Sequence, residues 1–211
     1  MKLYGTPPTR AIRVQWLLNE LGIDCEVVAV NPLGDQPPEF LALNPARKLP
    51  VLVDGDVVLT ESAAIPLYLA EKFPERGLIP AGLADRAQMY RWIFFLVTEI
   101  EQPLWRIALN TTIYPEADRV PADIKNATRD CKKMLAVFEH HMSDREFVAS
   151  DRLSVADFIA AYTLDWANQA EMLGDAPRLK AYLKTMYARP TAPMTIKQSF
   201  AAMRQVVDAK R

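Results

Sequence analysis

The amino-acid sequence changes character once, at residues 74–82, and this change constrains the fold more than any single motif. Before it, short β-branched runs alternate with helical patterns, whereas from about Asp85 onward nearly every apolar pattern has the helical repeat. The stretch between them, PERGLIPAG, concentrates proline and glycine as a short linker does. We therefore expect two domains, residues 1–77 and 85–211, joined by a linker at residues 78–84.

The first domain reads as a mixed α/β unit. Strands are predicted at residues 2–5, 25–30, 51–53 and 57–59, the last two flanking an Asp-Gly turn typical of a hairpin. Between the first two strands, apolar residues recur at helical spacing from Val14 to Leu21, and Gly22 marks the helix end. This order implies a parallel strand pair with an antiparallel hairpin added to it. A further helix is predicted at residues 61–73.

The second domain reads as all helix. Helices are predicted at residues 85–110, 122–142, 154–172, 177–188 and 194–207, with prolines between several of them. The clearest local signal is Ser154-Val155-Ala156-Asp157, a capping box in which the serine and aspartate each bond the other's backbone N–H. An acidic residue beside an apolar stripe in this setting is a folding device, so we do not interpret Asp157 as catalytic.

Composition excludes several classes of function. The chain has 25 Lys and Arg against 26 Asp and Glu, a formal charge of -1 and no basic block, so a nucleic-acid partner is not expected. Its two histidines are adjacent and cannot share a helix face, so no metal site is expected. The longest strongly apolar run, residues 93–97, predicts no membrane span, and the first residues show no export signal. With only two cysteines, Cys25 and Cys131, a reducing, cytoplasmic location is expected.

Polar features of the first domain define a candidate site. Thr6 and Thr9 stand where a strand feeds a helix start, a place that favours an anion. Pro50 precedes a strand, which leaves the first strand amide available to a peptide, and Lys48 offers a cation. The dipeptide Glu61-Ser62 opens the next helix, where amides can hold a carboxylate and the acid an ammonium. These groups together fit a small zwitterionic peptide that carries a thiolate.

The set of motifs resembles cytosolic glutathione S-transferases along nearly the whole chain. The matching segments are YGTPPTR at 4–10, NPARKLPVL at 44–52, Glu-Ser at 61–62 with the helix behind it, and the capping box. The resemblance is to a bacterial type that uses a serine or threonine hydroxyl rather than a tyrosine. It implies a thioredoxin-like βαβαββα domain that binds glutathione as co-substrate, followed by an all-helical bundle domain, with no metal.

The resemblance also implies roles for individual residues. Pro50 corresponds to the family's cis-proline, and the backbone of Leu49 pairs with the cysteinyl part of glutathione. Glu61 and Ser62 bind its γ-glutamyl end, while Lys48 and Gln36 stand near the glycyl end. The activating hydroxyl aligns with Thr9 in plant-type enzymes and with Thr6 in other bacterial types, and Thr9 is the favoured assignment. Tyr4 is expected in the core rather than at the reaction.

Three departures from the family pattern bear on efficiency rather than on the fold: a threonine in place of serine, tyrosine or cysteine, Arg47 in place of glycine, and Pro66 inside a helix, where it should remove a hydrogen bond or bend the helix. The helical domain is expected to hold the hydrophobic substrate, with candidates Phe95, Trp105, Arg106 and Tyr114. The resemblance further implies a homodimer and a role in detoxification.

Three classes of function remain open at this point. The leading hypothesis is a transferase that conjugates glutathione to a small hydrophobic electrophile. The alternatives are a glutathione-dependent disulfide or peroxide reductase and a non-catalytic binding protein on the same fold. No cysteine lies near Thr6 or Thr9, which argues against a protein-thiol mechanism but not against one that uses two glutathiones.

Overall fold

The structure, a computed structural model, describes residues 1–208, with side chains for residues 1–205. It divides into two compact units. One contains residues 1–79 together with the described residues from Arg189 onward, and the other contains residues 80–188. The sequence pattern placed the last helix with the helical domain, whereas in the structure it groups with the N-terminal unit.

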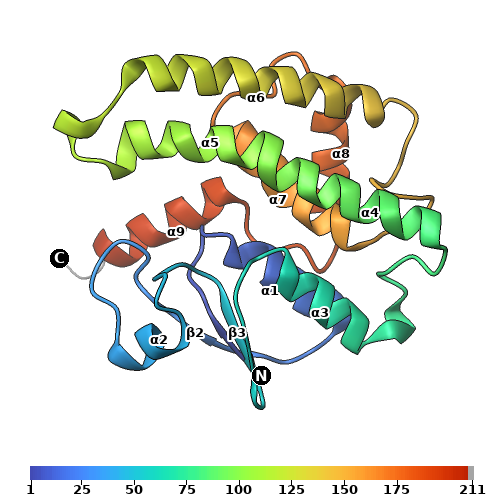
Figure 1. Cartoon of the computed structure of the whole chain (residues 1–211), viewed down its shortest axis with the longest axis horizontal. Helices are drawn as coiled ribbons and strands as arrows, with labels where there is room; N and C mark the ends of the chain where they lie inside the picture. Colours follow the sequence, from blue (N-terminus) through green and yellow to red (C-terminus); the bar gives the residue numbers. More distant parts are fainter. Residues whose placement is uncertain (209–211) are drawn as a thin grey trace. The chain divides into compact units, whose positions relative to one another are not determined.

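A four-stranded sheet forms the centre of the N-terminal unit (Figure 1). Its strands are β1 (Lys2–Tyr4), β2 (Glu26–Val28), β3 (Val51–Asp54) and β4 (Val57–Leu59), in the order β2-β1-β3-β4. β1 is parallel to β2 and antiparallel to β3, and β3 and β4 form an antiparallel hairpin. The predicted parallel pair and the hairpin are therefore confirmed. Gly55 in the hairpin turn has a φ of 59°, a conformation that favours glycine.

The helices of this unit are α1 (Ala11–Leu21), α2 (Pro38–Leu43), α3 (Ala64–Lys72) and α9 (Ile196–Asp208), with a single 3₁₀ turn at Pro74–Arg76. Gly22 ends α1, as predicted; it has the left-handed conformation, and its N–H donates back into the last turn. The expectation that Pro66 removes a hydrogen bond is wrong. Because α3 begins at Ala64, Pro66 lies in the first turn, where backbone N–H groups have no acceptor within the helix.

A small apolar cluster supports the start of β3. Val30, Phe40 and Val51 are buried together, and Tyr4 packs on them with its ring centroid 5.8 Å from that of Phe40. Tyr4 is thus a partly buried residue that packs against the core. The short helix α2, which the residue pattern did not predict by itself, supplies Phe40 to this cluster.

The second unit consists of α4 (Leu83–Phe95), α5 (Glu101–Ala108), α6 (Pro121–His141), α7 (Val155–Gln169) and α8 (Pro177–Tyr187), with a 3₁₀ turn at Glu116–Asp118. The sequence predicts one helix over residues 85–110. In the structure two wider π-helical segments, Leu96–Ile100 and Leu109–Ile113, interrupt it. Pro103 accounts for the first, because its ring crowds the carbonyl four residues earlier, at Glu99.

The capping box at the start of α7 is present as predicted. The Asp157 carboxylate accepts hydrogen bonds from the backbone N–H of Ser154 (2.8 Å) and Val148 (2.9 Å), and from the hydroxyls of Ser154 (3.0 Å) and Tyr182 (2.8 Å). Its side chain is completely buried. Burial raises the pKa of Asp157, and these hydrogen bonds oppose that change. The carboxylate therefore links the loop at Val148, the start of α7 and Tyr182 of α8.

Candidate active site

The strand register brings four loops to one edge of the N-terminal sheet. Tyr4 and Val28 pair at the ends of parallel strands, β3 begins at Val51 opposite Tyr4, and β4 ends at Leu59 opposite Leu52. The loops that follow β1, β2 and β4 and the loop that precedes β3 therefore leave the sheet at the same edge. They carry all the site residues predicted in this domain: Thr6, Thr9, Gln36, Lys48, Leu49, Pro50, Glu61 and Ser62.

The hydroxyl groups of Thr6 and Thr9 differ in the hydrogen bonds that they form. Thr6 donates its hydroxyl hydrogen to the carbonyl of Val30 (2.8 Å) and accepts the N–H of the same residue (3.0 Å), which ties the end of β1 to the chain after β2. Thr9 accepts from the N–H of Ala11 at 3.4 Å, at the start of α1. Its hydroxyl hydrogen has no acceptor among the described residues. Thr9, unlike Thr6, can thus donate to a ligand.

The loop before β3 is organised by Asn44. The buried side chain of this residue donates to the carbonyl of Lys48 (2.8 Å) and accepts from the N–H of Ala46 (3.2 Å). The peptide bond between Leu49 and Pro50 is cis, as is the one between Pro7 and Pro8. Sequence reasoning gave Asn44 no role, although an Asn-Pro pair is a turn signal that could have pointed to it.

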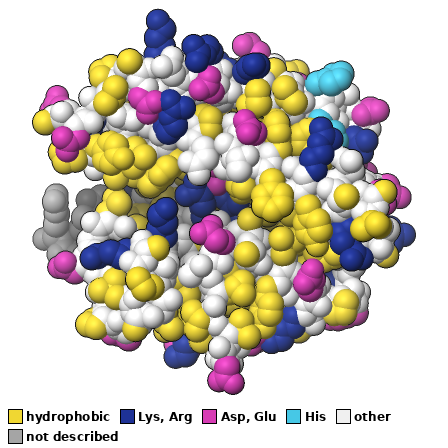
Figure 2. Space-filling view, in the orientation of Figure 1, with side chains coloured by type: hydrophobic (Ala, Val, Ile, Leu, Met, Phe, Trp, Pro, Cys, Tyr) yellow, Lys and Arg dark blue, Asp and Glu magenta, His cyan; other side chains and the backbone are white. Residues whose placement is uncertain are grey.

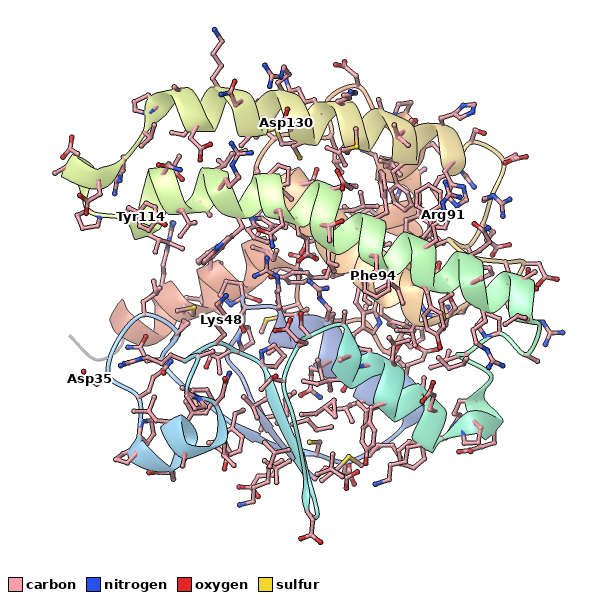
Figure 3. All side chains as sticks on the ribbon, in the orientation of Figure 1. Asp35, Lys48, Arg91, Phe94, Tyr114 and Asp130 are labelled. Carbon is pink, nitrogen blue, oxygen red and sulfur yellow. The ribbon has the colours of Figure 1, made fainter. Side chains whose placement is uncertain are left out.

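The side chain of Lys48, which is labelled in Figure 3, is exposed on this ordered loop. It makes no ion pair with any residue that the structure describes, whereas its carbonyl is fixed by Asn44. Asp35, also labelled in Figure 3, is exposed on the loop after β2. A lysine whose backbone is held and whose ammonium is free is suited to pair with a carboxylate of a ligand.

Gln36 fastens two of the site loops together. Its amide nitrogen donates to the carbonyl of Asn31 (3.0 Å) and to that of Arg47 (3.1 Å), so both amide hydrogens are used. Its side chain is only 9% exposed, and the amide oxygen is buried without a partner among the described residues. The predicted ligand-binding residue therefore has a positioning role for the loop that carries Lys48.

Glu61 and Ser62 lie immediately before α3. Glu61 has a φ of 67°, which is uncommon for a residue with a side chain, and its carbonyl accepts the N–H of Ile65 (3.0 Å). The Glu61 side chain is exposed and Ser62 is largely buried. No side chain caps the first turn of α3. The N–H of Ile65 is used by Glu61 and Pro66 has no N–H, so among the first three residues of the helix only Ala64 keeps an N–H that is available to an anion. An unusual backbone conformation at an uncapped helix start is characteristic of a functional site.

The four residues predicted to contact the hydrophobic substrate, all in the helical unit, have different surroundings. Arg106 forms ion pairs with Asp123 and Asp130 of α6, and the guanidinium holds the pKa of Asp123 below its usual value. These pairs give Arg106 a structural role. The ring of Trp105 lies 6.5 Å from that of Trp166, and Phe95 lies 5.0 Å from Trp92. Tyr114 is 41% exposed at the end of the second π-helical segment (Figure 3).

Charge and metal chemistry add little to this site. On the face drawn in Figure 2, acidic and basic side chains are interspersed over each unit. Among the described residues, no group of three His, Cys, Asp or Glu side chains is placed to hold a metal ion. Nor does this part of the chain contain a helix that is both long enough and apolar enough to cross a membrane.

Comparisons with known proteins give one consistent result. The family model for the glutathione S-transferase N-terminal domain matches residues 1–71, and that for the C-terminal domain matches residues 96–190. Glutathione S-transferase 3 of Zea mays is 31% identical over 207 residues and 93% of each chain. Glutathione S-transferase 1 of Dianthus caryophyllus is 34% identical over 202 residues and 90% of each chain. A solved sphingomonad glutathione S-transferase complexed with glutathione is 28% identical, with a TM-score of 0.81 over 94% of this chain and 98% of that one.

Proposed function

Because the chain belongs to the glutathione S-transferase family and is a glutathione transferase, we propose that it conjugates the glutathione thiolate to a small hydrophobic electrophile. The Thr9 hydroxyl donates a hydrogen bond to the sulfur. The observation that carries this assignment is the contrast between the two threonines: the Thr6 hydrogen is committed to Val30, whereas the Thr9 hydrogen has no acceptor among the described residues.

The loops at the sheet edge supply the remaining contacts of the proposal. The uncapped start of α3 and Ser62 receive the γ-glutamyl carboxylate, and Glu61 pairs with the ammonium. The backbone of Leu49 pairs with the cysteinyl residue in the manner of an added strand. Lys48 pairs with the glycyl carboxylate, and Gln36 holds the Lys48 loop in place through Arg47. The ammonium and the glycyl carboxylate thus each meet a group of opposite charge, and the γ-glutamyl carboxylate meets neutral hydrogen-bond donors at a helix start.

Hydrogen bonding by Thr9 is strong enough for the proposed task. A thiol with a pKa of about 8.5 is about 3% ionised at pH 7, and lowering its pKa by two units takes about 2.7 kcal/mol and gives about 76% thiolate. A hydrogen bond to a charged group supplies about 1.5–3 kcal/mol, and the α1 start about 0.3–1 kcal/mol. The two effects together suffice, and Thr9 keeps its own proton.

Thiolate formation alone raises the rate only about 25-fold, which is the ratio of the two ionised fractions. The rest of the acceleration comes from holding the electrophile against the sulfur. The helical unit supplies that apolar surface, with Phe95, Trp105 and Tyr114 as the candidates left after Arg106 is assigned to its ion pairs. A homodimer, a cytoplasmic location and a role in detoxification are part of the same proposal.

The assignment is tested by comparing Thr9→Ala with Thr6→Ala, each assayed for conjugation of a reactive aryl halide and for glutathione affinity. Thr9→Ala should lower the rate at pH 7 by about 10- to 25-fold, since the hydrogen bond to sulfur is lost. Its glutathione dissociation constant should stay within about threefold, because the other contacts remain. Thr6→Ala should retain a larger share of the rate.

An unchanged rate in Thr9→Ala would contradict the role of this hydroxyl. Thr9→Ser serves as the matched rescue variant, because it keeps the hydroxyl and loses only the methyl group. A reversed ranking, with Thr6→Ala the slower enzyme, would transfer the role to Thr6.

A further inference from the structure

One side of the long helix α6 carries basic residues and no acidic residue. The exposed Lys, Arg, Asp and Glu residues of this helix are Lys125, Arg129, Lys132 and Lys133. Because an α-helix has 3.6 residues per turn, these four positions fall within an arc of about 100° around the helix axis. We call them the α6 stripe.

The acidic residues of α6 are all engaged by other groups of the same unit. Asp123 pairs with Arg106, and Asp130 pairs with both Arg106 (3.6 Å) and Arg129 (3.2 Å). Glu139 accepts two backbone N–H groups at the start of α8, each at 2.8 Å. One cation of the stripe, Arg129, is therefore partly compensated, and the acids of the helix have no contact with its lysines.

The three lysines of the stripe keep their charge uncompensated. None of them forms an ion pair with a residue that the structure describes. α6 lies at an outer edge of its unit (Figure 1), and α5 and α8 pack against it. The start of α8 adds one acid, Asp175, and two cations, Arg178 and Lys180, so it does not reverse the charge of this surface.

The residue types of the stripe favour a membrane surface over a protein partner. Lysine is a strongly hydrated point charge and is depleted in protein interfaces. The same arc of α6 contains Ala122 and Ala136 but no Trp, Tyr or Phe that could anchor a protein partner. A leaflet with anionic lipids attracts clustered lysines and arginines on a helix without such an anchor.

The apolar side of α6 cannot take part in this contact. Cys131, Leu135 and Phe138 are buried in the core of the unit. An interfacial helix that inserts into lipid does so with its apolar face. Contact through the α6 stripe is therefore electrostatic, with the lysines at the level of the headgroups and no insertion.

We propose that the α6 stripe is a docking surface for membranes that contain anionic lipids. Each cation near such a surface contributes about fivefold in affinity, which is about 1 kcal/mol, so the three uncompensated lysines together give about 100-fold. The stripe uses none of the residues assigned to glutathione. It therefore adds a location to the proposed function without depending on it.

The test mixes the full-length protein with vesicles of phosphatidylcholine alone, or of phosphatidylcholine and phosphatidylserine in equal amounts, and measures cosedimentation. The protein should bind the phosphatidylserine vesicles saturably and the neutral vesicles weakly. Binding should be lost as salt is raised from about 0.1 M to about 1 M, because the Debye length shrinks from about 10 Å to about 3 Å. The combined variant Lys125→Gln, Lys132→Gln and Lys133→Gln should bind about 100-fold more weakly.

A matched variant separates the stripe from net charge. Arg152→Gln, Lys197→Gln and Arg204→Gln together remove the same three charges from exposed positions elsewhere and should keep the affinity within about threefold. Because all six positions are exposed, both variants should fold, which urea denaturation checks.

Three results would overturn the proposal. The first is equal binding to neutral and phosphatidylserine vesicles, and the second is a stripe variant that binds like the wild type or like the matched variant. The third is binding of soluble polyglutamate without binding of phosphatidylserine vesicles, which would assign the stripe to an acidic protein segment instead.

Discussion

The start of α7 and the start of α3 use the same residue types in opposite ways. At α7, Ser154 is followed by an aspartate that lies fully buried and accepts four hydrogen bonds from the protein itself. At α3, Ser62 is preceded by a glutamate whose side chain is exposed and whose backbone has a φ of 67°. The α7 start has a complete capping box, whereas no side chain caps α3.

This difference separates stability from function. Where every polar group at a helix start is hydrogen-bonded within the protein, these bonds stabilise the fold, and no donor or acceptor is left to bind a ligand. Where the amides and an acidic side chain are left open, the same chemistry is available for binding. Each of the following experiments changes one of the two helix starts, or the hydrogen-bond network attached to the α7 start, and asks which property of the protein changes.

The largest effect is expected for Asp157→Ala. The change removes a buried carboxylate and leaves the N–H of Val148, the N–H of Ser154 and the hydroxyl of Tyr182 without this acceptor. The free energy of unfolding should fall by about 3 kcal/mol or more, measured by urea denaturation. Glutathione affinity of the folded protein should be unchanged.

Asp144→Ala, at an exposed position of the same unit, is the control and should stay within about 0.5 kcal/mol of the wild type. A loss of less than about 1 kcal/mol in Asp157→Ala would show that the hydrogen bonds of this carboxylate contribute little, and the contrast with α3 would disappear.

An intermediate effect, on binding alone, is expected for Glu61→Gln. Loss of the charge opposite the glutathione ammonium should raise the dissociation constant by about 10- to 30-fold, which is about 1.4–2 kcal/mol. Stability should stay within about 0.5 kcal/mol, because the side chain is exposed. Calorimetric titration with glutathione measures the first quantity and urea denaturation the second.

Glu61→Gly separates backbone from side chain at this position. Glycine adopts the left-handed conformation readily, so stability should hold or rise while affinity for glutathione falls. If instead both Glu61 variants lose stability and bind glutathione normally, this helix start is a folding device like that of α7.

The smallest effect concerns His141, which extends the α7 network. Its Nε2 is 2.7 Å from the carbonyl of Val148, whose N–H bonds Asp157, and its ring stacks on Trp92 with centroids 3.8 Å apart. Burial holds the pKa of His141 below 6.5, its ordinary value. The unfolded chain therefore takes up this proton first as the pH falls, and stability decreases below about pH 6.5.

His141→Gln should remove part of that decline in the free energy of unfolding between pH 7 and pH 5. His140→Gln, which replaces the exposed neighbouring imidazole, is the matched control. Equal pH profiles for wild type and His141→Gln would show that protonation of this imidazole does not cause the loss of stability at low pH.

Sequence reasoning found the elements whose signals are local. The capping box at Ser154, the helix stop at Gly22 and the hairpin turn at Gly55 each need only neighbouring residues, and each is present. The first π-helical segment, by contrast, depends on how Pro103 meets the turn before it. The prediction for Pro66 is wrong because it places the start of the helix too early. The grouping of the segment from Arg189 onward, which includes α9, with the N-terminal unit involves residues far apart in the sequence, such as Asn19 and Thr191, which share a hydrogen bond.

The same distinction applies to the candidate site. The residue types at Lys48, Leu49, Pro50, Glu61 and Ser62 could be recognised in the sequence, because each occurs in a motif. The hydrogen bonds of Thr6 could not be predicted there, since its hydroxyl is paired with Val30, which follows β2 and lies 24 residues away in the sequence. The role of Gln36 likewise depends on carbonyl groups of two other loop residues.

The central claim, that this site turns bound glutathione into a thiolate, is tested most directly by the ultraviolet thiolate absorbance of the glutathione-saturated protein as a function of pH. The account predicts a midpoint about two units below the pKa of about 8.5 of a free thiol, and a return toward that value in Thr9→Ala. Saturable binding with the midpoint at the free value, in wild type and variant alike, would contradict it.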